Sequence, residues 1–491
     1  MATSGEWVTP ARYDGFDTMP LGGRWRAGRS GRIAVDTDPW SGRALAEIPL
    51  ADVGDLYGAF VAALQAQRSW AAQSPAYRAD IMLAAAAVVQ HRRAEIVDWL
   101  VRETGGILAR AELEWGLVRS VLLEAASAPY SAAGSIVPSD APGRESRVYR
   151  QPAGVVAVIG SWEFPMHRSG RCVAAALATG NAVVLKPASD TPVTGGLLLA
   201  RILEEAGLPD GLLSVVIGAG GEIGEAVAVH PIPSVVSFTG SACVGERLAR
   251  TAGVAAVKRL ALEFGGSGPI VVLEDADVGR AADAAVFGSF FRHGQICMVT
   301  NRLIVDRRVY DEFTERLVAE VRCLRAGDPA AADTDVGPLL SAARLSTVQD
   351  MLKRVRDEGA RQVLGGEPRG PTGLLLPPHV LLARGDMTTA QEAVYGPVIT
   401  VIRARNGDDA LKIANRCEYG RSGAVFTADP ERGARFAAGM AAGMTHVNAS
   451  PANDDANAAI GGTRACGIDR FGGRWAVEAF TAPRLVSQPH P

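Results

Sequence analysis

The chain has 491 residues, of which 48% are hydrophobic and 21% charged, as in an ordinary globular protein. At roughly 150 residues per domain, this length predicts about three structural units. The net charge is −3 and no basic stripe is present, which argues against nucleic acid and anionic membranes as the main partners.

The six cysteines are scattered, with no CxxC pair and no His/Cys cluster at zinc-ligand spacing. This pattern predicts no metal site and no disulfide framework, and it fits reduced thiols in a cytoplasm. The N-terminal segment MATSGEWVTPARYDG lacks the charged-then-apolar pattern of a signal peptide. No apolar run reaches the roughly 18 residues of a membrane span. We therefore expect a cytoplasmic protein without a membrane partner.

The first 50 residues are rich in glycine, proline and tryptophan and predict short strands and turns. From residue 53 to about 128 the apolar spacing predicts helices, among them one helix over 81–106 that Gly105-Gly106 ends. Residues 131–151 form a polar stretch with a strand-like end, which predicts an arm or a hairpin.

Short apolar runs alternate with helical stretches in the next hundred residues. This alternation favours a parallel, doubly wound sheet, because strands buried on both faces are continuously apolar. A second α/β unit is predicted from 269 to about 448, and the turn-rich tail from 465 ends in a possible strand. The four predicted strands of the first unit are 154–160, 181–186, 212–218 and 234–240.

Two glycine-rich strand ends are candidates for binding a dinucleotide, since helix N-terminal amides attract phosphate. The segment GAGGEIG, which ends at Gly224, is one residue too long for the usual fingerprint, so the match is weak. In FTGSACVG, the small residues Gly240 and Gly245 would let a pyrophosphate approach the backbone, and Ser241 could donate to it. Ser241 could equally be the N-cap of the next helix.

Three further side chains are candidates whose local pattern also fits an ordinary structural role. Lys186, at the end of a buried strand, is well placed to hold ribose hydroxyls, or it is a surface lysine. Cys297, between a helical stretch and a strand, is a candidate nucleophile or a buried small residue. Glu263, before a Gly-Gly turn, is a candidate general base or an exposed loop charge.

Together these segments resemble the aldehyde dehydrogenase superfamily, in order and at matching separations, from about Gly22 to Val486. The closest likeness is to its branch acting on benzaldehyde-, salicylaldehyde- and vanillin-type substrates. The segments that carry the resemblance are GVVAVIGSWEFP (154–165), NAVVLKPASDTP (181–192), SFTGSACVG (237–245), LEFGGSGP (262–269), GQICMVTNR (294–302), YGPV (395–398) and GGTRACGIDRFGG (461–473).

The resemblance implies a role for each candidate. Cys297 matches the nucleophile, whose thiolate adds to the aldehyde, and Glu263 matches the base that activates water. A thiohemiacetal then passes hydride to the nicotinamide and leaves a thioester, which water releases as the acid. Lys186 matches the ribose-binding lysine and Trp162 the tryptophan along the cofactor. Ser241 and Gly245 match the phosphate-side contacts, and Gly224 and Gly240 stay cofactor candidates from their glycine-rich loops.

The chain departs from the family at Glu163, where the usual asparagine donates its side-chain amide to the oxyanion, together with the backbone amide of the cysteine. An ionised glutamate cannot donate, and losing one such donor costs roughly 3–4 kcal/mol, or 100–1000-fold in rate. Three interpretations stay open. Glu163 is protonated and still donates, or it pairs with a cationic substrate such as an imine or amino-aldehyde, or the protein is slow or inactive.

Two other departures concern the cofactor. The family usually has two glutamates in the segment QEAVYGP, and the second, which holds the nicotinamide ribose, aligns with Ala393. Glu392 is the remaining carboxylate of that turn and is kept as a cofactor candidate, although we expect it to point elsewhere. Ser189 aligns with a glutamate that NAD-preferring members set against the adenosine ribose, so NADP use is also expected.

We therefore predict an α/β fold with a Rossmann-like cofactor domain, a second α/β catalytic domain and a small β oligomerisation arm. The predicted function is oxidation of an aromatic or other hydrophobic aldehyde with NAD or NADP, by a homodimer or homotetramer. The alternative is a catalytically weak protein of the same fold with a binding or scaffold role. The predicted bounds are 1–128 and 151–262 for the cofactor domain, 263–448 for the catalytic domain, and 129–150 and 469–491 for the arm.

Overall fold

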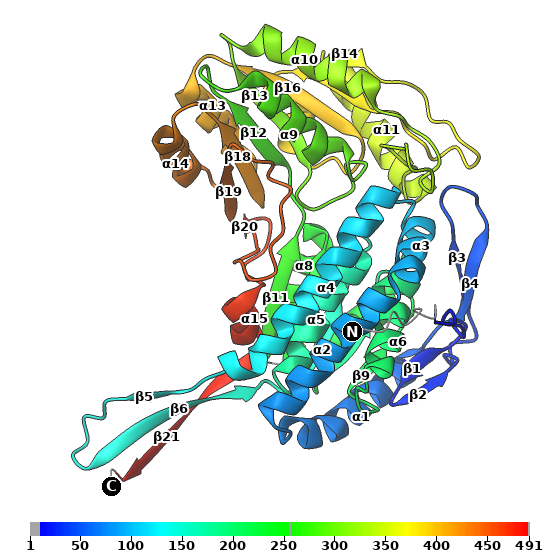
Figure 1. Cartoon of the computed structure of the whole chain (residues 1–491), viewed down its shortest axis with the longest axis vertical. Helices are drawn as coiled ribbons and strands as arrows, with labels where there is room; N and C mark the ends of the chain where they lie inside the picture. The colour runs from blue at the N-terminus through cyan, green and yellow to red at the C-terminus, as the bar shows by residue number, and fades with distance from the viewer. Residues whose placement is uncertain (1–9, 256, 490–491) are drawn as a thin grey trace, which may run out of the picture.

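The computed structural model of the chain describes residues 10–255 and 257–489. The N-terminal prediction for residues 1–9 and the last two residues of the predicted arm, 490–491, lie outside the described residues. Two α/β lobes are stacked along the long axis, and a thin β arm extends from the lower lobe (Figure 1). The predicted α/β fold class is confirmed.

The N-terminal segment consists of two small antiparallel hairpins followed by four helices. A capping box between Asp52 and Asp55 starts the first helix, Ser74 caps the second, and Gly105, in the left-handed conformation at φ 65°, ends the third. These elements are β1 (Met19–Leu21), β2 (Arg24–Arg26), β3 (Ile33–Thr37), β4 (Ala44–Pro49), α1 (Val53–Ala71), α2 (Pro75–His91), α3 (Arg93–Thr104) and α4 (Leu108–Ser131).

The single helix predicted over 81–106 is wrong, because the chain breaks at Arg92 into α2 and α3. Arg92 leaves helical geometry with ψ at 18°, and its guanidinium bonds Glu205 at 2.7 Å and Glu95 at 2.8 Å. Glu205 lies in a later helix, so the ion pair that accompanies the break is a tertiary contact.

The lower lobe contains a five-stranded parallel sheet in the order β11-β10-β7-β8-β9. This is the doubly wound order, whose direction reverses between β7 and β10 and opens a crevice at the carboxyl ends of those strands. Its elements are β7 (Val155–Ile159), α5 (Pro165–Ala178), β8 (Ala182–Lys186), the π-helical turn η1 (Val193–Leu197), α6 (Leu198–Glu205), β9 (Leu213–Val215), α7 (Gly220–Val229), β10 (Val235–Gly240), α8 (Ala242–Ala255) and β11 (Arg259–Phe264).

The upper lobe contains a seven-stranded sheet in the order β14-β15-β16-β13-β12-β18-β19, parallel except for the β14–β15 pair. Its strands are β12 (Gly268–Val272), β13 (Thr300–Asp306), β14 (Arg361–Leu364), β15 (His379–Ala383), β16 (Val398–Ala404), β18 (Ser422–Phe426) and β19 (Met444–Val447). Its helices are α9 (Val278–Phe290), α10 (Tyr310–Cys323), α11 (Ala342–Asp357), α12 (Thr388–Gln391), α13 (Gly407–Ala414) and α14 (Pro430–Gly439).

The arm joins two distant parts of the chain. β21 (Thr481–Pro489) pairs antiparallel with β6 (Arg144–Pro152) along its whole length, and β6 also pairs with β5 (Ser135–Val137). The C-terminal strand follows α15 (Gly473–Phe480), and a short pair, β17 (Tyr419–Gly420) with β20 (Thr463–Arg464), connects the tail to the upper lobe. The strand predicted at the end of the tail is therefore present and lies in the arm (Figure 1).

Candidate active site

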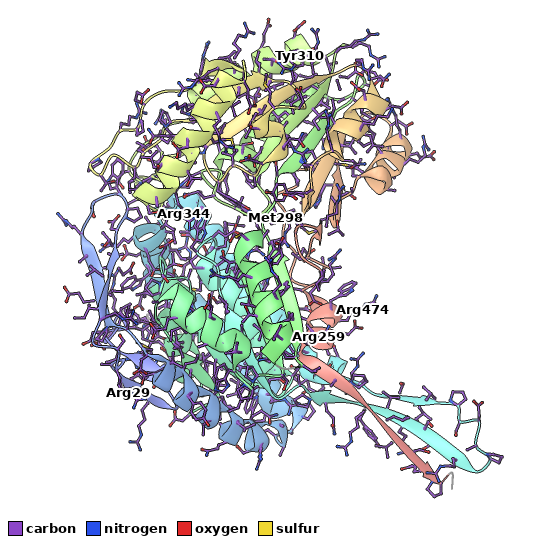
Figure 2. All side chains as sticks on the ribbon, turned by 180° about the vertical axis from the view of Figure 1, so that it is seen from behind. Arg29, Arg259, Met298, Tyr310, Arg344 and Arg474 are labelled. Atoms are coloured by element: carbon purple, nitrogen blue, oxygen red, sulfur yellow. The ribbon has the colours of Figure 1, made fainter. Side chains whose placement is uncertain are left out.

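Cys297 lies in the loop between α9 and β13, where the two lobes meet. Figure 2 labels its neighbour Met298 at this junction. Gly294 has φ 67°, and a Cβ there would lie 1.8 Å from the Gly396 carbonyl oxygen, so only glycine allows this close approach. The Gly266 amide donates to the Cys297 carbonyl at 3.2 Å, and the cysteine is 1% exposed. The loop is thus held from both sides.

Glu163 reaches this loop from the end of β7. Phe164 takes the left-handed conformation at φ 47° and Pro165 begins α5, so the chain turns sharply and directs Glu163 inward. The carboxylate is 6% exposed and accepts a hydrogen bond from the backbone amide of Cys297. That amide is one of the two donors that the resemblance implies for an oxyanion, and here a carboxylate occupies it.

Glu263, near the end of β11, is fully buried and bound by arginines. One carboxylate oxygen pairs with Arg171 and the other with Arg421, and Arg168 lies 3.6 Å away. Burial alone would raise the pKa of Glu263, but the three guanidinium groups lower it to about 2. The side chain is therefore a firmly ionised partner of arginines at neutral pH.

Arg168 contacts Cys297 directly. Its Nη2 donates to the cysteine Sγ at 3.2 Å, and its Nη1 donates to Asp454 at 3.1 Å. Burial raises the pKa of the Cys297 thiol, Arg168 lowers it and Glu163 raises it, which leaves it at about 11. Burial likewise raises the pKa of Glu163, against the attraction of Arg168.

The arginines around the cysteine are the residues that sequence reasoning missed. Arg168 and Arg171 stand on α5, in which every residue is buried, and Arg421 precedes β18. Arg110 and Arg292 lie over the Phe164 ring, each 4.5 Å from its centroid. The sequence does contain a signal for them, namely charged residues inside an otherwise apolar helix between two buried strands. Buried charges are rare unless they are paired, so such residues point to an ion-pair cluster.

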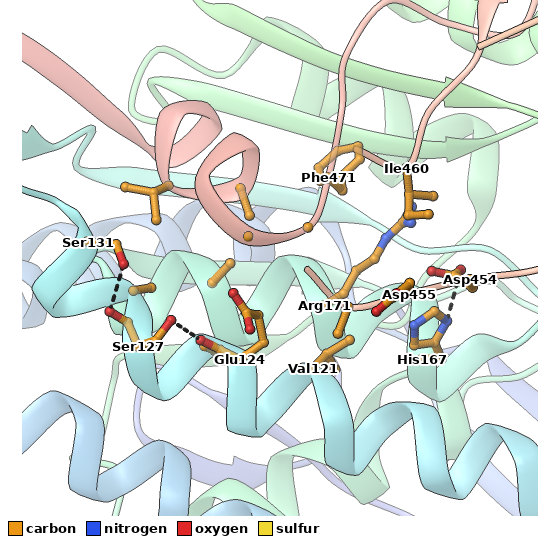
Figure 3. Close-up of a pocket in the computed structure, with 18 residues that line it drawn as sticks. Val121, Glu124, Ser127, Ser131, His167, Arg171, Asp454, Asp455, Ile460 and Phe471 are labelled. Carbon is orange, nitrogen blue, oxygen red and sulfur yellow. Dashed lines mark hydrogen bonds and ion pairs between the residues drawn. The ribbon is translucent and has the colours of Figure 1, made fainter. Parts of the chain in front are cut away.

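A pocket of about 530 Å³, part of it open to solvent, leads to this cluster between α4, α5 and the tail. Figure 3 shows Arg171 reaching past Phe471 and Ile460, and His167 beside Asp454, whose Oδ2 is 4.0 Å from its Nδ1. Burial lowers the pKa of His167 to about 3, so the imidazole is neutral at physiological pH. The Nε and Nη1 atoms of Arg171 are buried without a hydrogen-bond partner among the described residues.

Two of the lower-lobe cofactor candidates, Lys186 and Gly224, line a second pocket, of about 790 Å³ including open solvent, between α7 and α8. Lys186 lines it, 5% exposed, and its amine donates only to the Pro187 carbonyl among the described residues, at 3.2 Å. Burial lowers the pKa of Lys186 to about 8, although Asp190 raises it. A Cβ added at Gly224 would meet nothing within 4 Å, so the backbone there is open to a ligand.

The segment FTGSACVG ends β10 and starts α8 beside this pocket. The Ser241 Oγ accepts from the Val244 amide at 3.4 Å, as an N-cap does. A Cβ on Gly245 would lie 2.0 Å from the Phe264 ring, and one on Gly240 would lie 2.6 Å from Phe238, so close packing already requires both glycines. Ser189 is exposed in the turn after β8.

Trp162 and Glu392 lie on the side of the junction that faces α11. The guanidinium carbon of Arg344 lies 3.5 Å from the Trp162 ring centroid, and Arg344 also pairs with Asp190 at 3.1 Å. Glu392 forms a two-pronged pair with Arg354 near the surface, at 2.8 and 3.0 Å. The structure thus brings Cys297, Glu163 and Glu263 into one cluster and leaves Glu392 outside it.

The described residues were also compared with the requirements of a metal site and of a membrane span. Within 10–255 and 257–489, no group of three or more His, Cys, Asp or Glu side chains is arranged to hold a metal ion. No helix in the same residues is long and apolar enough to cross a membrane.

The lower lobe has the doubly wound sheet typical of dinucleotide-binding domains, and a buried cysteine lies where it meets the second lobe. This combination is typical of α/β dehydrogenases that use a thiol. The aldehyde dehydrogenase family model matches residues 25–486, and the chain belongs to that family. The predicted family is therefore confirmed.

Several relatives that match nearly the whole chain are named vanillin or benzaldehyde dehydrogenases. The chain is 43% identical to a vanillin dehydrogenase of Corynebacterium glutamicum, over 97% of this chain and 99% of the relative. It is 38% identical to a benzaldehyde dehydrogenase of Bacillus subtilis, over 98% of each chain. A benzaldehyde dehydrogenase of Pseudomonas putida that is 34% identical is named as NAD-dependent, over 94% of each chain. The predicted nicotinamide cofactor is thus confirmed at the level of the family.

Solved structures agree. The fold matches an NAD-dependent benzaldehyde dehydrogenase of Corynebacterium glutamicum with a TM-score of 0.90 and 42% identity, over 98% of this chain and 99% of the other. It also matches a salicylaldehyde dehydrogenase of Pseudomonas putida, solved with salicylaldehyde, with a TM-score of 0.92 and 32% identity, over 96% and 97%.

Proposed function

We propose that this chain oxidises an aromatic aldehyde to its carboxylic acid with NAD or NADP. The observation that carries the proposal is the near-complete, 43% identical match to a vanillin dehydrogenase, together with a cysteine at the matching position of the junction. Ile460 and Phe471 offer apolar surface for a ring, and the unpartnered Arg171 donors would suit a polar ring substituent.

In this proposal, Cys297 is the nucleophile that forms the thiohemiacetal and then the thioester. A bound nicotinamide cofactor would accept the hydride. The lower-lobe pocket fits the adenosine end of such a cofactor, because it is lined by the open backbone at Gly224 and by the buried amine of Lys186, whose hydrogen bond to the Pro187 carbonyl leaves further donors. Trp162 would lie along the nicotinamide side, and Ser241 would meet phosphate.

Release of the acid needs a base, and the pairing of Glu263 with arginines works against that role. A carboxylate with a pKa near 2 is a weak proton acceptor at neutral pH. We propose that Glu263 acts as base only when Arg171 or Arg421 moves away from it, and that hydrolysis of the thioester is therefore the slow half of the reaction. Glu163 is the other carboxylate beside the cysteine.

The second candidate is a protein of this fold with weak catalysis and a binding role. The paired Glu263 and the Glu163 carboxylate on the Cys297 amide favour it. The cationic imine or amino-aldehyde alternative fits less well, because the buried cluster holds five arginines, and its carboxylates Glu114, Glu263 and Asp454 are already paired with them. Those arginines are Arg110, Arg168, Arg171, Arg292 and Arg421.

Cofactor reduction with a panel of aldehydes separates the two candidates. Benzaldehyde, vanillin, a short aliphatic aldehyde and an amino-aldehyde should be tested with NAD and with NADP, next to the Cys297→Ala variant. We expect turnover on the aromatic members that the variant loses. Cofactor binding by calorimetry without turnover on any member would favour the binding role.

We also propose the predicted domain division and a homo-oligomer, and the β arm supports both. The β21–β6–β5 arm projects from the lower lobe, and its β5 edge is unpaired within the described chain. An exposed strand edge invites pairing with another copy. Scattered cysteines, four buried and two exposed, support a reducing cytoplasm.

A further inference from the structure

Glu163 removes the oxyanion site that this family's sequence pattern implies. The asparagine amide is absent, and the carboxylate that replaces it accepts the Cys297 backbone N–H. A negative charge that develops beside Cys297 then meets a carboxyl group where two donors are expected. A working site needs a hydrogen-bond donor from elsewhere, because each missing donor raises the activation free energy by roughly 3–4 kcal/mol.

Arg168 is the donor that the geometry offers. Its Nη2 lies 3.2 Å from the Cys297 Sγ, and the residue is 2% exposed. Asp454 accepts a hydrogen bond from Nη1 at 3.1 Å, which holds the guanidinium through a second nitrogen. Arg168 Nε is buried without a hydrogen-bond partner among the described residues, so the group keeps donor capacity for a further acceptor.

We propose that Arg168 is a catalytic residue, which stabilises the Cys297 thiolate and then the alkoxide that forms when the thiolate attacks the aldehyde. This inference rests on the proposed function. The thiol proton leaves to water in an earlier equilibrium. The sulfur lone pair then forms the C–S bond, the C=O π pair moves onto oxygen, and no proton is transferred in that step. The negative charge moves from the sulfur to the oxygen two bonds away, where the same guanidinium would donate to it.

Charged groups from several neighbouring elements act on the sulfur. Arg168 from α5, Arg421 before β18 and Arg292 after α9 favour the thiolate. Glu163 and Glu263 oppose it. Glu263 is itself neutralised by Arg171 and Arg421, which leaves Arg168 as the cation that touches the sulfur. Removing Arg168 should therefore raise the pKa of Cys297 further than removing any other arginine of the cluster.

The test measures the thiolate directly. Rates of Cys297 alkylation by iodoacetamide are followed from pH 6 to 10, and the Cys297 peptide is quantified by mass spectrometry, so that the exposed Cys243 and Cys323 do not interfere. Arg168→Met should slow alkylation at pH 8 by about tenfold or more, since a thiol pKa higher by about one lowers the thiolate fraction roughly tenfold. Arg168→Lys should recover part of the rate. Arg292→Met removes a buried arginine that acts on Cys297 through space without touching the sulfur, and should slow alkylation by a clearly smaller factor than Arg168→Met.

A second measurement needs no reagent to enter the site. The ultraviolet absorbance of the thiolate is titrated in each variant and corrected with its Cys297→Ser counterpart. Thermal melting checks that Arg168→Met is folded, and Arg168→Lys decides the question if it is not. The inference is overturned if both variants titrate and alkylate as the unmodified protein does, or if Arg292→Met has the same effect as Arg168→Met. Absence of aldehyde turnover with a strong Arg168 effect would reject the proposed function and leave the role of Arg168 at the sulfur standing.

Discussion

Replacing Glu163 with asparagine should raise the rate of aldehyde oxidation. The substitution frees the Cys297 amide from a carboxylate and adds a side-chain amide donor at the same place. One oxyanion donor is worth about 100–1000-fold in rate. Arg168 lies 3.2 Å from the sulfur and already supplies part of this stabilisation in the unmodified protein. We therefore expect an increase in rate of about 10- to 100-fold.

The dependence of the rate on pH tests the same prediction. Burial raises the pKa of Glu163, so the group is protonated at low pH and ionises as the pH rises toward its folded pKa. Ionised Glu163 opposes both thiolate and oxyanion, which adds a descending limb. Ionisation of Cys297, with a pKa of about 11, adds a rising limb. The unmodified protein should therefore show a narrowed bell, and Glu163→Asn a rate that keeps rising toward alkaline pH.

The assay is the pre-steady-state burst of cofactor reduction with benzaldehyde and saturating cofactor at each pH, because the burst reports thiolate attack and hydride transfer before the slow hydrolysis of the thioester. Glu163→Gln removes the charge at nearly constant shape and should also lose the descending limb. Glu114→Gln is the matched control, because Glu114 is a buried carboxyl with a raised pKa that accepts the Met166 and His167 amides. An unchanged or lower rate in Glu163→Asn would refute the reasoning and give the carboxylate a positive role.

Cys297, Ser189 and Lys186 each give a prediction of their own. Cys297→Ala should abolish oxidation and acyl-thioester trapping, while Cys417→Ala, also buried, should retain both; undiminished turnover in the first would reject the nucleophile. Ser189→Glu should weaken NADP binding by about tenfold or more relative to NAD, since it sets a charge against the 2′-phosphate; equal losses in titration calorimetry would show that this turn does not contact the adenosine ribose. Lys186, with a pKa of about 8, should hold the cofactor less well above that pH. Lys186→Met should bind about 10-fold more weakly at pH 7 and lose this pH dependence, and a mutant with the same pH dependence would exclude Lys186 from the contact.

The strands of the lower lobe were predictable because they are buried on both faces. All residues of β7 and β8 are buried, so a continuous apolar run marks each of them. The break at Arg92 was not predictable, since it goes with an ion pair to Glu205, 113 residues further along. Local periodicity contains no information about a partner at that distance.

The candidate site divides in the same way. Glu163 stood out in the sequence because it replaces a residue with the opposite hydrogen-bonding capacity. The pairing of Glu263 with Arg171 and Arg421 did not, because it joins three elements that are 92 and 158 residues apart. Gly245 has a packing reason of its own, since a Cβ there would lie 2.0 Å from the Phe264 ring, and its role at the phosphate stays a prediction.

Glu163 and Arg168 are best understood as one electrostatic unit. A carboxylate inserted beside a buried thiol raises the cost of every negative charge in the reaction, and an arginine on the sulfur offsets that cost. If the two changes compensate, their effects cannot be additive. Arg168→Met should be less harmful in a Glu163→Asn background, because the asparagine then supplies the donor and removes the repulsion. The interaction energy of the double-mutant cycle measures how far the two residues depend on each other. A value near zero would mean that the carboxylate and the guanidinium act on the reaction independently, and the compensation argument would fail.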